Sequence, residues 1–155
     1  MNKKILIDIV GILLLVLIVL IGYKLSPLLM PKADFTVDPD PACNLQLQAC
    51  TVTLPGGERL TVEAGTRPIP LVRSFQWRVL VPDAGVRRVD VDFSGVDMDM
   101  GFNRPQLQAA KDGMFVADVS LPVCVTGRMT WQATVLLETA SARIAVPFRF
   151  VTGEP

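Results

Sequence analysis

The chain has 155 residues, of which 50% are hydrophobic, with 15 basic residues, 15 acidic residues and no histidine. A balanced charge with scattered basic residues disfavours nucleic-acid binding, which needs a clustered basic face. The absence of histidine excludes Ser-His and Cys-His nucleophiles, and it removes the usual ligand of copper(II) and zinc. No phosphate-binding loop or metalloprotease motif occurs either, so we expect a protein that is not an enzyme.

The first predicted element is a membrane-spanning helix from Ile5 to Tyr23. At about 1.5 Å per residue this apolar run reaches about 28 Å, close to the roughly 30 Å of a bilayer's hydrocarbon core. Asp8 lies in its first turn, within reach of the headgroups, so we assign it no function. A cleaved secretory signal is the alternative, but no Ala-x-Ala-like site follows the run. We therefore expect an uncleaved signal-anchor over residues 1–25, which contacts the lipid bilayer through residues 5–23.

The orientation of this helix follows from the charges at its ends. Lys3 and Lys4 directly precede the apolar run, and cytoplasmic flanks tend to be rich in lysine and arginine. Lys24 and Lys32 on the far side reduce the asymmetry. The sequence predicts a single-pass protein of the bacterial inner membrane, with its C-terminal domain in the periplasm.

A proline-rich segment over residues 26–42 follows the predicted helix. It contains Pro27, Pro31, Pro39 and Pro41. Proline removes backbone donors and restricts the residue before it. We therefore expect a stiff, extended tether that lifts the next domain off the membrane surface.

Residues 43–155 have the pattern of one all-β domain. Apolar and polar residues alternate in seven short runs, which is the period of half-buried strands. The runs are 50–54, 60–62, 75–81, 89–93, 115–121, 129–137 and 144–150. They favour an immunoglobulin-like antiparallel sandwich of about seven strands, with Trp77 and Trp131 in its core, and a small barrel is the alternative. Pro147 cannot donate to a ladder, so we expect it at an edge-facing or bulged position.

Three cysteines in an oxidising compartment allow at most one internal disulfide. Locality favours Cys43 with Cys50, which would pin the tether to the first strand. Cys124 is then a small buried apolar residue, or it pairs with Cys50 if the strand order differs from a simple meander.

The stretch from Gly95 to Pro105 is less generic than the rest. It holds a Met98-x-Met100-Gly101 motif, and a strand opened by Asp112-Gly113 follows it. Over about residues 86–151 the chain resembles the FixH/YtkA-like family of membrane-anchored extracytoplasmic domains. The resemblance implies an immunoglobulin-like sandwich and, for FixH-type members, a role in assembling a copper-containing terminal oxidase.

Four residues of this stretch are candidates for binding a partner or a metal: Met98, Met100, Asn103 and Arg104. In an extended segment the thioethers of Met98 and Met100 point the same way, and soft sulfur ligands suit copper(I). The alternatives are that both methionines pack over the open end of the sandwich, or that they form a partner-binding surface.

Acidic residues near the motif are a further possible metal site. They are Asp90, Asp92, Asp97 and Asp99. They lack the spacing of a calcium loop, so we interpret them as part of a solvated strand face.

Together these patterns predict a non-enzymatic, membrane-anchored periplasmic accessory protein. The resemblance implies that it assists the assembly or maturation of a respiratory, copper-containing oxidase, and we therefore expect it to dock onto a membrane protein complex. A general interaction or structural module of the cell envelope, with no metal role, is the alternative. Neither alternative includes nucleic acid.

Overall fold

The computed structural model describes residues 3–29, 33–82, 85–122 and 127–153. Cys124 lies outside these residues, so its predicted burial is not tested. Its alternative pairing with Cys50 is contradicted, because Cys50 is bonded to Cys43. The chain divides into two compact units, residues 1–32 and residues 33–155. Each unit is described by itself.

The first unit is the single helix α1 (Lys3–Leu29). Its segment Lys3–Lys24 is long and apolar enough to cross a membrane. The helix ends four residues beyond the predicted boundary at residue 25, so residues 26–29 are helical and do not belong to a tether. A single proline removes one N–H from the helix and often only bends it, so Pro27 was a poor marker of the helix end.

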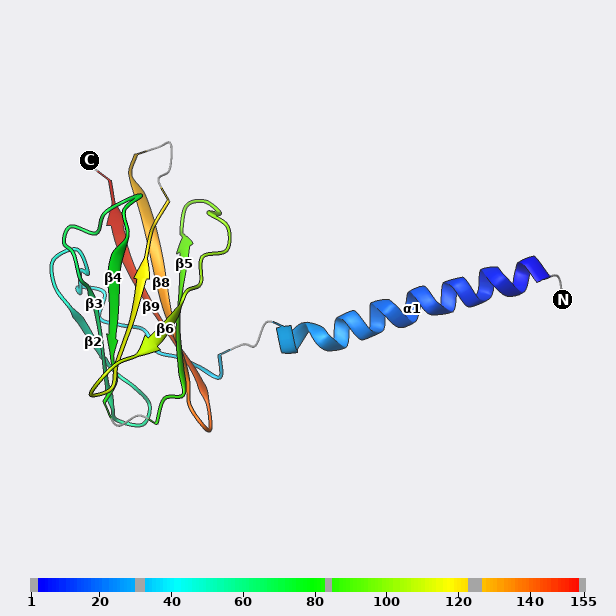
Figure 1. The fold of residues 1–155 in the computed structure, drawn as a ribbon, viewed down its shortest axis with the longest axis horizontal. Helices are drawn as coiled ribbons and strands as arrows, with labels where there is room; N and C mark the ends of the chain where they lie inside the picture. Colours follow the sequence, from blue (N-terminus) through cyan, green and yellow to red (C-terminus); the bar gives the residue numbers. More distant parts are fainter. Residues whose placement is uncertain (1–2, 30–32, 83–84, 123–126, 154–155) are drawn as a thin grey trace. The chain divides into compact units, whose positions relative to one another are not determined.

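The second unit is a mixed sheet of nine strands in the order β1-β9-β8-β5-β6-β7-β4-β3-β2 (Figure 1). The sheet curls around one core, and β6 pairs with both β5 and β7. The strands are β1 (Phe35–Thr36), β2 (Cys50–Thr53), β3 (Arg59–Ala64), β4 (Phe75–Leu80), β5 (Arg88–Gly95), β6 (Gln106–Ala109), β7 (Met114–Val119), β8 (Met129–Glu138) and β9 (Arg143–Thr152).

The structure has nine strands where the sequence predicted about seven. All seven predicted runs form strands, and β1 and β6 are the two that were missed. Strand β1 has two residues, and β6 buries only Leu107, so neither is long enough to show a period of two.

The predicted core is confirmed. Both tryptophans are fully buried, and the Trp77 ring on β4 meets the Phe93 ring on β5 edge-on, with 5.1 Å between centroids. Trp131 lies on β8 and donates a hydrogen bond from Nε1 to Thr152 Oγ1 at 3.0 Å. Aromatic rings from several strands therefore meet inside the curled sheet.

The structure joins Cys43 to Cys50, the pairing that locality favoured. The two Cα atoms are 5.8 Å apart. Because Cys50 is the first residue of β2, the bridge ties the segment before the strand to the sheet.

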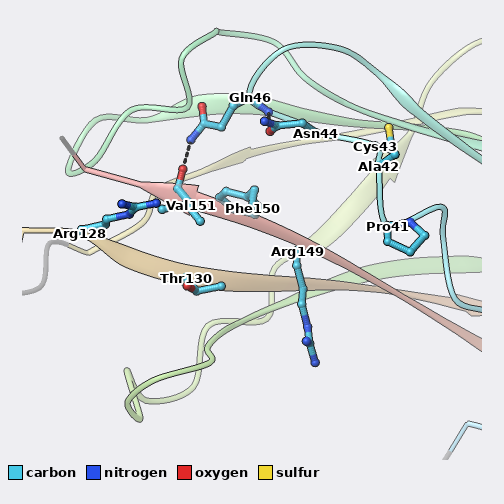
Figure 2. Close-up of a pocket in the computed structure, with 10 residues that line it drawn as sticks. All are labelled: Pro41, Ala42, Cys43, Asn44, Gln46, Arg128, Thr130, Arg149, Phe150 and Val151. Atoms are coloured by element: carbon cyan, nitrogen blue, oxygen red, sulfur yellow. Dashed lines mark hydrogen bonds between the residues drawn. The ribbon is translucent and has the colours of Figure 1, made fainter. Parts of the chain in front are cut away.

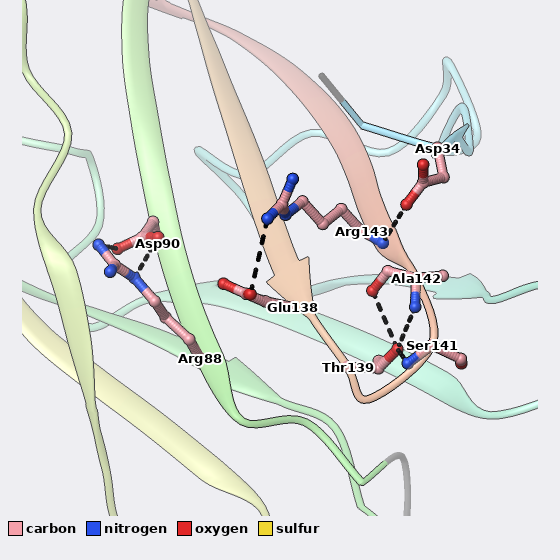
Figure 3. Close-up of polar contacts among 8 residues, drawn as sticks. All are labelled: Asp34, Arg88, Asp90, Glu138, Thr139, Ser141, Ala142 and Arg143. Atoms are coloured by element: carbon pink, nitrogen blue, oxygen red, sulfur yellow. Dashed lines mark hydrogen bonds and ion pairs between the residues drawn. The ribbon is translucent and has the colours of Figure 1, made fainter. Parts of the chain in front are cut away.

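The chain enters the second unit beside the start of β9 (Figure 3). Asp34 exchanges two hydrogen bonds with Arg143: its N–H donates to the Arg143 carbonyl, and its carboxylate accepts from the Arg143 N–H, both at 2.8 Å. Strand β1 then pairs with β9 in parallel. Residues 34–37 were predicted as tether but belong to the sheet, because an extended segment pairs wherever its N–H groups are available.

Pro147 faces an edge, as predicted. The register between β8 and β9 is continuous from Met129↔Thr152 to Glu138↔Arg143, so β9 has no bulge. The backbone groups of Arg143 and Ala145 bond to Asp34 and Val37, which shows that the odd-numbered residues of β9 turn their N–H and C=O groups away from β8. Proline at position 147 therefore costs no bond to β8.

Candidate functional site

The candidate site is the loop between β5 and β6. After β5 the chain turns and runs back beside it: the Phe93 N–H donates to the Asn103 carbonyl at 2.9 Å, and the Val91 N–H donates to the Pro105 carbonyl at 3.1 Å. On the other side the Val96 N–H donates to the Thr130 carbonyl of β8 at 2.9 Å. Both ends of the loop are thus fixed to the sheet.

Gly95 allows the loop to fold tightly over the end of β5. A Cβ atom here would overlap the Met98 carbonyl oxygen and Met129 Cε, and it would lie 3.2 Å from Met100 Cγ. Backbone and methionine side chains therefore occupy the space that a side chain would need. Met129, which opens β8, was not among the predicted site residues, because 29 positions separate it from the motif.

Met98 and Met100 lie in different environments. Residues 96–98 form a bend rather than an extended segment, so the same-side argument does not hold. Met98 is 37% exposed, whereas Met100 is half-buried and packs against the core. Packing against the core accounts for the apolar side chain of Met100, whereas the exposed side chain of Met98 can contact a partner.

The acidic residues of this region are occupied by the protein's own donors. The Asp99 carboxylate accepts from the Gly101 N–H at 2.8 Å, and the Asp97 carboxylate accepts from the Thr130 N–H at 3.4 Å. Gly101 has φ +76°, a conformation that favours glycine. Both aspartates are exposed, as expected for solvated residues, but they lie in the loop and not on a strand face. Their oxygens also fix the loop, through one N–H of the loop itself and one of β8. Within the described residues no three His, Cys, Asp or Glu side chains gather as a metal site would require.

Asn103 and Arg104 hold the returning arm of the loop. Asn103 Nδ2 donates to the Ser120 carbonyl at 3.2 Å. Arg104 pairs with Asp92 at 3.0 Å, and its guanidinium lies 5.5 Å from the Phe102 ring centroid. Both candidates thus contribute to the loop's shape, and Arg104 also supports an exposed aromatic ring.

Asp90 makes a second ion pair on the outer face of β5. Arg88 Nε lies 2.8 Å from its carboxylate (Figure 3). This hydrogen bond and then the charge of Asp90 raise the pKa of Arg88 above its ordinary value. The Arg88 side chain is about half exposed, so solvent screens the pair and it contributes little to stability, but it leaves this face without a strong charge of one sign.

The sequence argument missed Phe102, which is 84% exposed. Five further large apolar side chains are exposed at the same end of the second unit, where β5 and β9 end. We call these six residues the apolar end; they are Leu47, Val72, Val96, Met98, Phe102 and Val151. The sequence did contain a signal for this exposed ring, because Phe102 directly follows a glycine in a loop. Alternation of apolar and polar residues identifies strands and gives no information about loops.

Comparisons with protein-family models, with curated proteins and with solved structures find no match to this chain. The resemblance to FixH/YtkA-like domains therefore stays a prediction.

Proposed function

We propose that this chain is a non-enzymatic accessory protein, anchored in the inner membrane, whose β unit lies in the periplasm and docks onto a membrane protein complex. Helix α1 supports an anchor, because it is long and apolar enough to cross a bilayer. The Cys43–Cys50 disulfide supports an oxidising compartment. Lys3 and Lys4 favour a cytoplasmic N-terminus.

We infer that the curled sheet is an immunoglobulin-like sandwich. Strands β1, β9, β8 and β5 make one half, β2, β3, β4 and β7 make the other, and β6 pairs with a strand of each. The contact between Trp77 and Phe93 joins the two halves. The packing of side chains from both halves into one core supports this architecture.

The apolar end carries the docking proposal. Among the described residues of the β unit, only Phe35 is a large exposed apolar side chain outside it. The chain enters beside Arg143, at the start of β9, whereas the apolar end lies where β9 ends. An anchored domain with its exposed apolar surface at the end opposite its attachment is suited to meet a partner that rises from the membrane.

The complex in question is a copper-containing respiratory oxidase during assembly or maturation. This part of the proposal rests on the resemblance of the Met98-x-Met100-Gly101 stretch to FixH-type domains. A general interaction module of the cell envelope would use the same apolar end with a different partner.

A copper(I) role is a second candidate, and Met129 favours it. Met100 Cγ and Met129 Cε both lie beside the Gly95 backbone, so two thioether side chains approach one point, with Met98 on the same loop. Thioethers are soft ligands that suit copper(I). Copper(II) and zinc do not fit, because the chain has no histidine.

The docking proposal is tested with two matched variants of the full chain. Phe102→Asp places a charge in the apolar end, and Phe35→Asp does the same at an exposed phenylalanine elsewhere. We expect Phe102→Asp to reduce recovery of oxidase subunits from mildly solubilised membranes by more than about tenfold, as a central interface residue would. Phe35→Asp should leave recovery unchanged.

Two other results would contradict parts of this proposal. Equal recovery with both variants would exclude the apolar end as the docking surface. If Phe102→Asp instead reduced recovery of a different envelope complex, the chain would be a general interaction module.

The copper(I) role is tested by anaerobic competition titration of the double variant Met98→Leu, Met100→Leu, which keeps the apolar volume. Unchanged copper(I) affinity would exclude the motif as the copper site.

A further inference from the structure

The second half of β9 has an edge with which no strand of the described chain pairs. Odd-numbered residues of β9 turn their backbone groups away from β8, so the Pro147 carbonyl, the Arg149 N–H and C=O, and the Val151 N–H face this side. Within the described residues these four groups have no hydrogen-bond partner. We call the backbone of residues 147–151 on this side the open edge.

Prolines explain why the chain's own N-terminal segment does not close the open edge. Strand β1 runs parallel to β9, and its last bond joins the Val37 N–H to the Ala145 carbonyl at 2.9 Å. In a parallel ladder the next donors would be residues 39 and 41. Both are proline and have no N–H to offer, so the ladder stops and the segment separates from β9.

Two adjoining hollows lie along the open edge, between β9 and the segment that carries the prolines. Their volumes are about 340 and 440 Å³, and both are lined by Pro41, Cys43 and Arg149. Gln46 limits the larger one, because its Nε2 donates to the Val151 carbonyl at 2.6 Å (Figure 2). The same side chain accepts from the Ile69 N–H at 2.7 Å, so this boundary is fixed on two sides.

Charged side chains of both signs border the two hollows. Arg149 lines both of them, is exposed and donates from Nε to Gln132 at 3.3 Å, and Arg128 lines the larger one. Asp38 and Asp40 line the smaller one from the segment that carries the prolines, so only the position directly opposite Arg149 favours an acid. An acidic side chain opposite Arg149 would be stabilised. A second copy of this chain is disfavoured, because two open edges paired about a twofold axis at position 149 would set two arginines directly opposite each other.

We propose that the open edge binds an extended segment of a partner protein with one acidic residue opposite Arg149, and that this segment adds to the sheet as a tenth strand beside β9. Backbone groups at positions 147, 149 and 151 supply the hydrogen bonds, and Arg149 supplies the preference for an acid. Residues 147–151 cover about 13 Å at 3.3 Å per residue, which is enough for a segment of about five residues. The proposal does not depend on the apolar end, with which the open edge shares only Val151.

The test uses the full chain in detergent micelles and a labelled, capped heptapeptide, Ser-Thr-Val-Glu-Val-Thr-Ser. Its central glutamate can lie opposite Arg149 in an antiparallel pairing. Two matched peptides carry lysine in place of glutamate, or a methyl group on the glutamate nitrogen. We expect each change to weaken binding by about tenfold, because one removes the charge pair and the other removes a ladder hydrogen bond.

Two variants of the chain test the binding site itself, because each is judged by a difference between matched variants or matched peptides and not only by the amount of folded protein. Arg149→Pro removes the outward N–H without touching the bonds to β8. We expect it to weaken binding of the unmethylated glutamate peptide about tenfold more than Arg149→Ala does, because Arg149→Ala removes the same side chain but keeps the N–H. Arg149→Glu keeps the backbone, and we expect it to reverse the preference from the glutamate to the lysine peptide. Absence of binding up to the solubility limit, or equal affinity for all three peptides, would overturn the proposal. A dimer that Arg149→Pro dissociates would assign the open edge to a second copy instead.

Discussion

The two core tryptophans differ in the hydrogen bonding of their indole N–H groups. Trp131 Nε1 donates to Thr152 Oγ1, whereas the buried Trp77 Nε1 has no partner among the described residues. Thr152→Val keeps the shape of the side chain but removes the acceptor, and it leaves a buried N–H unsatisfied. We expect the free energy of unfolding to fall by about 1–3 kcal/mol.

Urea unfolding of the full chain in detergent, followed by tryptophan fluorescence, measures this loss. Thr53→Val is the control, because Thr53 is exposed on β2, and we expect a change within about 0.5 kcal/mol. If the two variants unfold at the same urea concentration, the Trp131 bond makes no net contribution.

Gly95 is the second residue whose role can be tested alone. In Gly95→Ala the new methyl group would overlap the Met98 carbonyl oxygen, and a backbone atom cannot move aside without shifting the loop. We expect destabilisation of about 1–3 kcal/mol, typical of overpacking. In Gly56→Ala the atoms nearest to the methyl group belong to the carboxylate of Glu58, which can rotate away, so thermal unfolding should change little. Equal melting temperatures would show that the loop adapts freely.

The sequence predicted which residues form the candidate site better than it predicted what each side chain contacts. Met98, Met100, Asn103 and Arg104 do lie in one loop, as their spacing required. Their orientations depend on Gly101, on the aspartates that cap the turn and on Met129 across the sheet. Such contacts are set by tertiary packing, and no period in the sequence encodes them.

The strands can be tested through the direction of their backbone groups. Gln132 and Arg149 lie opposite each other on β8 and β9, with both side chains on the outer face. The Gln132 N–H points to β5, however, while the Arg149 N–H points to the open edge. We expect Gln132→Pro to cost about 3 kcal/mol or more and Arg149→Pro to cost less than about 1 kcal/mol.

Circular dichroism melts of both variants distinguish these outcomes. Similar destabilisation by the two prolines would mean that β9 is covered on both sides, and the open edge would then not exist. Gln132→Ala and Arg149→Ala serve as controls, because they remove the same side chains and leave both N–H groups in place.

Alternation predicted the long strands because half-buried strands must repeat every two residues. It failed for β1, whose partner Ile144–Ala145 lies more than 100 positions away in the chain. Pro147 predicted an edge correctly, because a residue without an N–H cannot donate a hydrogen bond to a neighbouring strand. Pro27 misled, since a helix near its end tolerates the same loss.

The whole molecule consists of an apolar helix and a disulfide-linked β unit, and both are consistent with a protein exposed outside the cytoplasm. The proposed topology has the N-terminus inside and residues 33–155 outside. Two cysteine variants test it in intact cells: Ser141→Cys in the exposed turn between β8 and β9, and Asn2→Cys before the helix.

We expect a membrane-impermeant maleimide to label Ser141→Cys in intact cells, because the proposed topology places this turn in the periplasm. Asn2→Cys should react only after the membrane is permeabilised, and the parent chain gives the background from its native cysteines. The labelled chain should stay with the membrane fraction through α1. Protection of Ser141→Cys, or its release in soluble form, would contradict the anchored topology. Either result would also remove the reason for placing the apolar end and the open edge within reach of a periplasmic partner.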